Sequence, residues 1–282
     1  MTQVSFLNGQ FVNHDEAFLH IDDRAIQFAD GIYEVILFYN NKLIDIDLHL
    51  ERLFYGLDEL GIKFNYDKKE LIDNIYNLFP QNNLKSGSVY LQVTRGAAKR
   101  IQNYPASNVR PTIIMTVSPL KREITLKEMA EDFNAKIFED IRWKRCDIKS
   151  TSLLANTMLK EKASQQNYSE AILHRDNQIT EGSFSNVFMV KNNVLITRPA
   201  SNLILNGITR KRLLSLADNN KIKITEKIFT IDELLKADEL FVTSSTLLIR
   251  PITQVNDQNI GDGKIGKITK KMVEIYFNFL NY

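Results

Sequence analysis

The sequence predicts an α+β fold in which strands and helices are mixed without regular alternation. Short apolar runs separated by Asn-Gly and Asn-Asn pairs are typical of antiparallel hairpins. Leucines at spacings of three and four are typical of helices. Strands and helices do not alternate regularly along the chain, whereas a doubly wound sheet requires such βαβ alternation. With 282 residues, 44% of them hydrophobic and 25% charged, the chain has the composition of an ordinary globular protein of one or two domains.

The N-terminal part is expected to form a small domain of hairpins and two helices. Asp47 is expected to cap the first helix, which ends at Gly61, and Asp67 with Glu70 forms a capping box for the second. Strands are expected at 4–7, 10–12, 32–39, 42–46, 88–94 and 111–117.

A change of character at 118–123, Ser-Pro-Leu-Lys-Arg-Glu, predicts a linker between a small domain (1–117) and a larger domain (124–282). In the larger domain, Thr230 and Glu233 form another capping box. Strands are expected there at 135–143, 171–174, 186–190, 194–197 and 239–243, and helices at 156–166, 209–219 and 265–280.

Composition excludes several classes of function. Cys146 is the single cysteine, so no internal disulfide can form, and a reducing compartment, the cytoplasm, is expected. A net charge of +2 gives no indication of a nucleic-acid partner. Neither a signal peptide nor a membrane span is expected, and no Gly-x-Gly-x-x-Gly or Walker motif predicts a dinucleotide or P-loop site. We expect no metal site.

Lys149 is the candidate reactive residue. It stands at the edge of the apolar run 153–155, so partial burial can lower the pKa of its amine, and the cations Arg142, Lys144 and Arg145 act in the same direction. An amine with a lowered pKa can form a Schiff base. From local context alone, a solvated lysine is the simpler interpretation, because most lysines are solvated.

Three motifs change that balance: Asp-Ile-Lys-Ser at 147–150, Glu-Gly-Ser-x-Ser-Asn-Val-Phe at 181–188 and Gly-Ile-Thr-Arg at 207–210. Together they resemble the class IV aminotransferases, the pyridoxal-phosphate enzymes of fold type IV. Further matching segments lie at 30–35, 49–53, 92–96 and 239–244. All occur in the order in which the family has them, so the resemblance covers nearly the whole chain. The resemblance implies a homodimer in which each chain has a small N-terminal α/β domain and a larger C-terminal domain with a pseudo-barrel sheet.

The resemblance also implies a set of cofactor contacts. Lys149 holds pyridoxal 5'-phosphate as a Schiff base and shuttles the proton during catalysis, and Glu181 pairs with the ring nitrogen. Leu205 packs against the ring, and Arg142 lies near its phenolic oxygen. The phosphate is bound by Arg52, Ile208, Thr209, Ser244 and Ser245. Ile208 and Thr209 lie at a predicted helix start, where backbone N–H groups can donate to an anion. A simple helix cap at Thr209 and a surface arginine at Arg52 are the structural alternatives.

Within the family, the chain most resembles the branch that acts on D-amino acids, for which the implied reaction moves the amino group of D-alanine to 2-oxoglutarate. Tyr33 and Arg100 match that branch's site for the substrate α-carboxylate, whereas Gln102 replaces an expected histidine. Gln102 brings no positive charge, so weaker carboxylate binding is predicted. Branched-chain L-amino-acid aminotransferase and 4-amino-4-deoxychorismate lyase, of the same fold, remain alternatives. A non-catalytic binder of a phosphorylated ligand is the alternative outside the class.

Overall fold

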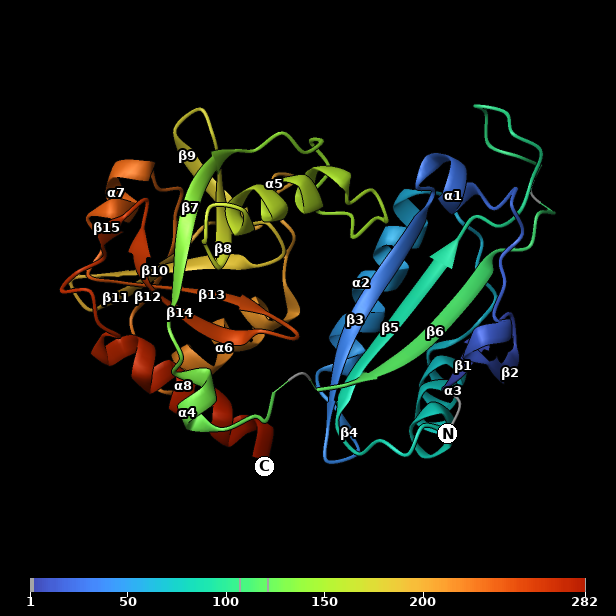
Figure 1. Cartoon of the computed structure of the whole chain (residues 1–282), viewed down its shortest axis with the longest axis horizontal. Coiled ribbons are helices and arrows are strands. Elements are labelled where there is room, and N and C mark those ends of the chain that lie inside the picture. The colour runs from blue at the N-terminus through green and yellow to red at the C-terminus, as the bar shows by residue number, and fades with distance from the viewer. Residues whose placement is uncertain (1–2, 107, 121, 282) are drawn as a thin grey trace. The chain divides into compact units, whose positions relative to one another are not determined.

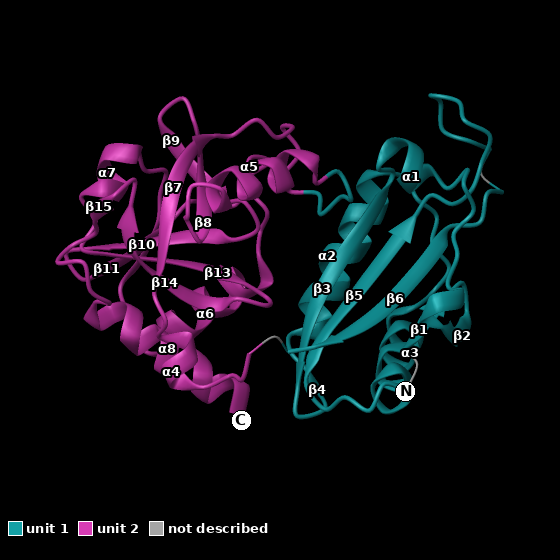
Figure 2. Cartoon of the chain, viewed as in Figure 1, with its two compact units in different colours: residues 1–121, 148–152 teal, residues 122–147, 153–282 magenta. Residues whose placement is uncertain are grey.

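The chain divides into two compact units (Figure 2). A computed structural model describes residues 3–106, 108–120 and 122–281. The first unit comprises residues 1–121 together with the short segment 148–152, and the second comprises residues 122–147 and 153–282. Lys149 therefore belongs to the first unit, although the chain before 148 and after 152 belongs to the second. The domain limits expected from the sequence, with a linker at 118–123, stay a prediction.

The first unit is an antiparallel sheet with two long helices (Figure 1). The strand order is β2-β1-β6-β5-β3-β4. Leucines of α2 and α3 pack with the strands into one buried core, in which Phe38 and Phe79 stack with ring centroids 4.0 Å apart. The elements are β1 (Val4–Leu7), β2 (Gln10–Asn13), η1 (His14–Glu16), α1 (Arg24–Phe28), β3 (Gly31–Tyr39), β4 (Lys42–Leu43), α2 (Ile46–Glu59), α3 (Lys68–Gln81), β5 (Gly87–Thr94) and β6 (Thr112–Pro119).

The second unit is built on a curled mixed sheet with the strand order β12-β11-β10-β13-β14-β7-β8-β9, and β15 pairs with β14 (Figure 1). Phe188 and Phe241 are paired across β10 and β13, and their rings stack at 5.0 Å. The elements are α4 (Leu126–Met129), β7 (Phe133–Glu139), α5 (Leu154–Ser164), β8 (Glu170–Arg175), β9 (Gln178–Gly182), β10 (Asn186–Lys191), β11 (Val194–Thr197), α6 (Ile208–Asn219), β12 (Ile224–Glu226), α7 (Ile231–Leu235), β13 (Glu239–Ser244), β14 (Leu248–Val255), β15 (Gln258–Asn259) and α8 (Lys267–Asn281). None of the helices among the described residues is long and apolar enough to cross a membrane.

The mixed architecture confirms the predicted α+β class, and both capping boxes are present as predicted. The expected cap of α2 was wrong, because the helix begins at Ile46 after Asp45, whose φ is +54°, and Asp47 lies in its first turn. β9 and β14 were not predicted. In β14, Pro251 pairs with Phe241 inside the sheet, where proline is disfavoured, so the local sequence argued against this strand. The strand expected to reach 143 ends at Glu139.

Candidate active site

The segment that holds Lys149 runs beside the start of β3. The N–H of Tyr33 donates to the carbonyl of Lys149 at 3.0 Å, and the N–H of Thr151 donates to the carbonyl of Gly31 at 2.9 Å. Ile148 is buried in the core of the first unit and fixes the segment from the other side. These contacts hold the half-buried Lys149 with its Nζ 4.2 Å from the centroid of the Tyr33 ring. Two predicted site residues, one for the cofactor and one for the substrate, are thereby brought together.

A buried charged cluster lies in the same unit. Both carboxylate oxygens of Glu34, the neighbour of Tyr33 on β3, accept hydrogen bonds from Arg52, at 2.7 and 2.8 Å. Nδ1 of His49 lies 2.7 Å from the same carboxylate. Burial alone would raise the pKa of Glu34, but Arg52 and His49 together lower it to about 2. Burial lowers the pKa of His49 below 6.5. The predicted phosphate ligand Arg52 is thus oriented by a carboxylate.

Glu34 and His49 were not singled out from the sequence. Glu34 lies inside the run 32–39, which the sequence predicts as an ordinary strand. The signal that could have found it is an acidic residue in the middle of an apolar strand, because a buried carboxylate requires a charged partner.

In the second unit, Glu181 at the end of β9 is the centre of a network. Nη1 of Arg142 donates to its Oε1 at 2.5 Å, and Nδ2 of Asn186 donates to its Oε2 at 3.0 Å. The backbone N–H of Leu205 lies 3.1 and 3.0 Å from the two oxygens. Burial raises the pKa of Glu181, and Arg142 with the N–H of Leu205 opposes that rise. The structure therefore brings three predicted cofactor residues together around one buried carboxylate.

Asp140 fixes the other side of Arg142. It accepts hydrogen bonds from Nε and Nη2 of Arg142 at 2.9 and 2.8 Å. Thr180 and Arg175 also contact its carboxylate. Burial raises the pKa of Asp140, but the two arginines lower it to about 2. Sequence reasoning missed Asp140, because its partners follow it by 2, 35 and 40 residues and no local pattern connects them.

The predicted phosphate residues of this unit lie at the start of α6 and the end of β13. Gly207 caps α6, and Ile208 and Thr209 are buried in its first turn. A Cβ on Gly207 would lie 2.0 Å from Oδ1 of Asn186. Asn186 pairs directly with Thr243 across β10 and β13.

The hydroxyls at the end of β13 differ in their partners. Oγ1 of Thr243 is buried and has no hydrogen-bond partner among the residues that the structure describes. Oγ of Ser244 accepts from the N–H of Leu247 at 3.1 Å. Ser245 follows in the turn after the strand. A helix start, nearby hydroxyls and a buried carboxylate are a donor and acceptor set that fits a phosphorylated pyridine.

The predicted substrate residues are only partly assembled. Tyr33 is buried and stacks on Tyr90 with centroids 5.7 Å apart, and burial raises the pKa of Tyr90 to about 12. Arg100 and Gln102 are exposed on the loop between β5 and β6. Among the described residues of the first unit, no hydrogen bond or ring contact joins either of them to Tyr33.

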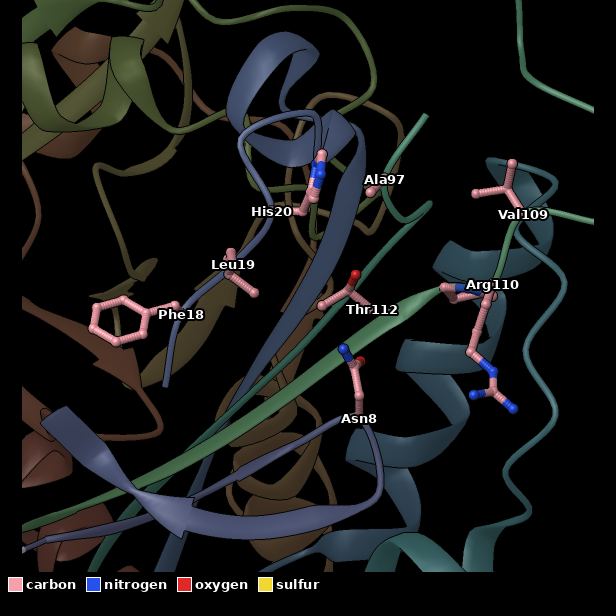
Figure 3. A pocket seen from close by; sticks show the side chains of 9 residues that line it. Asn8, Phe18, Leu19, His20, Ala97, Val109, Arg110 and Thr112 are labelled. Atoms are coloured by element: carbon pink, nitrogen blue, oxygen red, sulfur yellow. The ribbon is translucent and has the colours of Figure 1, made fainter. Parts of the chain in front are cut away.

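A pocket of about 300 Å³ in the first unit is separate from these residues (Figure 3). None of the predicted site residues lines it. Its walls come from the N-terminal segment and from the two ends of the loop between β5 and β6: Asn8, Phe18, Leu19, His20, Ala97, Val109, Arg110, Pro111 and Thr112.

Comparison with known proteins identifies the family. Residues 31–255 match the amino-transferase class IV family. The chain belongs to the class IV aminotransferases. Enzymes of this family depend on pyridoxal 5'-phosphate, which agrees with the donor and acceptor set described above.

Relatives with named activities cover almost the whole length of this class IV aminotransferase. A D-alanine aminotransferase of Staphylococcus epidermidis is 40% identical over 280 residues, which are 99% of this chain and 98% of that protein. One from Bacillus licheniformis is 42% identical over 265 residues, 94% of this chain and 93% of that protein.

Solved structures share the fold. The branched-chain amino acid aminotransferase of Escherichia coli has a TM-score of 0.93 at 23% identity, covering 99% of this chain and 95% of that one. A putative 4-amino-4-deoxychorismate lyase from Legionella pneumophila has a TM-score of 0.85 at 22% identity, covering 95% and 97%. These likenesses confirm the predicted fold-type IV architecture.

Proposed function

We propose that the chain is a homodimeric, cytoplasmic aminotransferase that moves the amino group of D-amino acids, D-alanine first, to 2-oxoglutarate. The observation that supports this substrate most directly is the 40% identity with a D-alanine aminotransferase over 99% of the chain. The branched-chain enzyme of similar structure is 23% identical, which supports the fold but not the substrate.

The predicted residues have distinct roles in holding the cofactor. Glu181 would accept a hydrogen bond from the ring nitrogen, because Arg142 and Asn186 orient its buried carboxylate. Leu205 would pack against the ring, and its backbone N–H already orients Glu181. The phosphate would be bound by Ile208, Thr209, Ser244, Ser245 and Arg52, which provide N–H, hydroxyl and guanidinium donors.

Lys149 would perform the proton transfer. Pyridoxal 5'-phosphate, when bound, stabilises negative charge at the substrate Cα. Nζ of Lys149 would hold the cofactor between turnovers and, once displaced by the substrate amine, would take the proton from Cα. The face of the Tyr33 ring and the backbone pairing with β3 restrict where this amine can be. Such restriction favours proton transfer, because the reacting groups are already positioned.

Substrate binding would use Tyr33, Arg100 and Gln102 for the α-carboxylate. Arg100 brings charge and Gln102 an amide donor, on a loop that is exposed in the single chain. Several large apolar side chains of the same unit are also exposed, among them Phe18 at 79% and Ile21 at 80%. A homodimer interface over this unit would cover part of that apolar surface.

The absorption spectrum of the purified protein with bound pyridoxal 5'-phosphate tests the proposal. D-alanine should convert the cofactor to its amine form, and addition of 2-oxoglutarate should restore the aldehyde form. L-leucine in a parallel sample should do neither. If only L-leucine converts the cofactor to its amine form, the chain is a branched-chain aminotransferase and the proposed substrate is wrong. Pyruvate release from 4-amino-4-deoxychorismate, with no conversion by either amino acid, would replace it with the lyase.

A further inference from the structure

The loop between β5 and β6 has little backbone support where it carries Arg100 and Gln102. In the described part of the chain, its backbone–backbone hydrogen bonds stop at Ala98 and resume at Ala106, whose carbonyl accepts from the N–H of Val109. Both ends of the loop border the pocket of the first unit rather than its core (Figure 3). A loop without such bonds needs side-chain contacts to hold one conformation.

Arg24 makes those contacts. Its Nη1 donates to the carbonyl of Ile101 at 2.9 Å and lies 3.5 Å from the carbonyl of Asn103. These carbonyls belong to the residues on either side of Gln102. The Arg24 side chain is 3% exposed, so its hydrogen bonds are shielded from water.

Phe28 extends the same support to Arg100. The guanidinium carbon of Arg24 lies 4.5 Å from the centroid of the Phe28 ring, and that of Arg100 lies 5.2 Å from it. One aromatic ring therefore contacts both guanidinium groups. Arg24 fixes the backbone around Gln102, and Phe28 provides the surface against which Arg100 rests.

Arg24 is itself anchored to the strand that carries Tyr33. Its Nε donates to Oδ2 of Asp30 at 2.7 Å, and Asp30 directly precedes the first residue of β3. Asp23, the N-cap of α1, accepts hydrogen bonds from the hydroxyls of Thr94 and Thr112 on β5 and β6. The short helix is thus fixed to three strands of the sheet, and Arg24 is a rigid point of attachment.

We infer that Arg24 is a positioning residue for the recognition of the substrate α-carboxylate, acting through the loop that carries Arg100 and Gln102. The inference rests on the proposed function. Because the guanidinium of Arg24 is buried against Asp30 and loop carbonyls, it acts on the substrate only through this loop. Its loss should therefore weaken the binding of substrates that have a carboxylate and leave the cofactor's own reactivity unchanged.

Arg24→Lys in the holoenzyme tests the inference. Lysine keeps the charge beside Asp30 but cannot donate to Asp30 and the loop carbonyls with one planar group. Asp30 keeps two hydrogen bonds from Arg95, so its carboxylate is not left unpaired. The KM for D-alanine should rise by about tenfold with little change in kcat, since hydrogen bonds that orient a charged ligand are weakened. The rate with hydroxylamine, which reacts with the bound cofactor but has no carboxylate, should not change.

A second readout does not depend on turnover. Hydrogen–deuterium exchange of the amides at 99–106 should be faster in Arg24→Lys than in the wild type. Phe28→Leu, which removes the ring but not the hydrogen bonds, should raise the same KM and provides a test if Arg24→Lys does not fold. Lys68→Gln, which removes an exposed charge on α3, is the matched control.

The outcomes separate the two proposals. An unchanged KM in a folded variant, or unchanged exchange at 99–106, overturns the role of Arg24. Failure of the wild type to react with D-alanine overturns the proposed function instead.

Discussion

Nζ of Lys149 lies 4.2 Å from the centroid of the Tyr33 ring, so the candidate reactive amine rests on the face of the candidate substrate-binding residue. The two residues are 116 positions apart in the sequence and are held together by the hydrogen bond from the Tyr33 N–H to the Lys149 carbonyl. The contact that orients the segment around Lys149 is made by backbone atoms. Substitution of the lysine side chain should therefore abolish the reaction and leave this hydrogen bond in place.

Lys149→Ala should abolish transamination while leaving the fold intact. We expect turnover of D-alanine to fall by about 10³-fold or more, because the proton-transferring group is lost. The free energy of unfolding should change by less than about 1 kcal/mol, because the backbone pairing with β3 remains. Lys144→Ala, which truncates an exposed lysine five residues earlier, is the control. Turnover comparable with that of this control would contradict the role of Lys149.

The cluster of Glu34, His49 and Arg52 should make stability depend on pH. Burial lowers the pKa of His49 below its ordinary value of 6.5, so the unfolded state binds more protons than the folded state as the pH falls through that value. The pKa of Glu34 is about 2 against an ordinary 4.5, so its contribution is complete above 4.5 and is lost as the pH falls towards 2. Both groups therefore destabilise the fold in acid, His49 first.

Urea unfolding between about pH 7.5 and pH 5 measures the stability lost through His49. The free energy of unfolding should fall by up to about 1.4 kcal/mol per pH unit, the value for one proton. His49→Gln should flatten the slope in this range. His20→Gln, at an exposed histidine, should keep it. A slope that is the same in His49→Gln and in the wild type would show that another group titrates.

Local chemistry made some of the fold predictable. The capping boxes at 67–70 and 230–233 were found from the sequence because each is complete within four residues. The role of Pro251 shows the opposite case. Its strand pairs with β13, which directly precedes it, and with β7 from a distant part of the chain, and this pairing overrides the local preference against proline.

The candidate site divides in the same way. Lys149 and Glu181 could be proposed because the motifs around them resemble those of the class IV aminotransferases. The residues that orient other parts of the site could not. Asp140, Glu34 and Arg24 act through partners that follow by 15 to 77 positions in their long-range hydrogen bonds. A buried charge in an apolar strand, as at Glu34, is the one local signal that such a partner exists.

Gly207→Ala should damage the cofactor cradle of the second unit. The new Cβ would lie 2.0 Å from Oδ1 of Asn186, whose amide is held by Glu181 and by the carbonyl of Leu205. We expect a loss of about 1–3 kcal/mol in the free energy of unfolding, because the close contact forces a shift. Affinity for pyridoxal 5'-phosphate should also fall. Combining Gly207→Ala with Asn186→Ala should cost less than the sum of the two single changes, as measured by urea unfolding. Simple additivity would show that the clash is relieved elsewhere.

Gln102→His should strengthen binding of the substrate carboxylate. The side chain is exposed, so the change has little packing cost, and an imidazolium adds the positive charge that glutamine lacks. The KM for D-alanine should fall by about tenfold, since a hydrogen bond gains a charged donor. The gain should grow as the pH falls through about 6.5, where the imidazole protonates. Steady-state kinetics across this range measures it, with Gln102→Asn as a control that keeps an uncharged amide. A KM that does not differ between the histidine and asparagine variants would mean that position 102 does not contact the carboxylate.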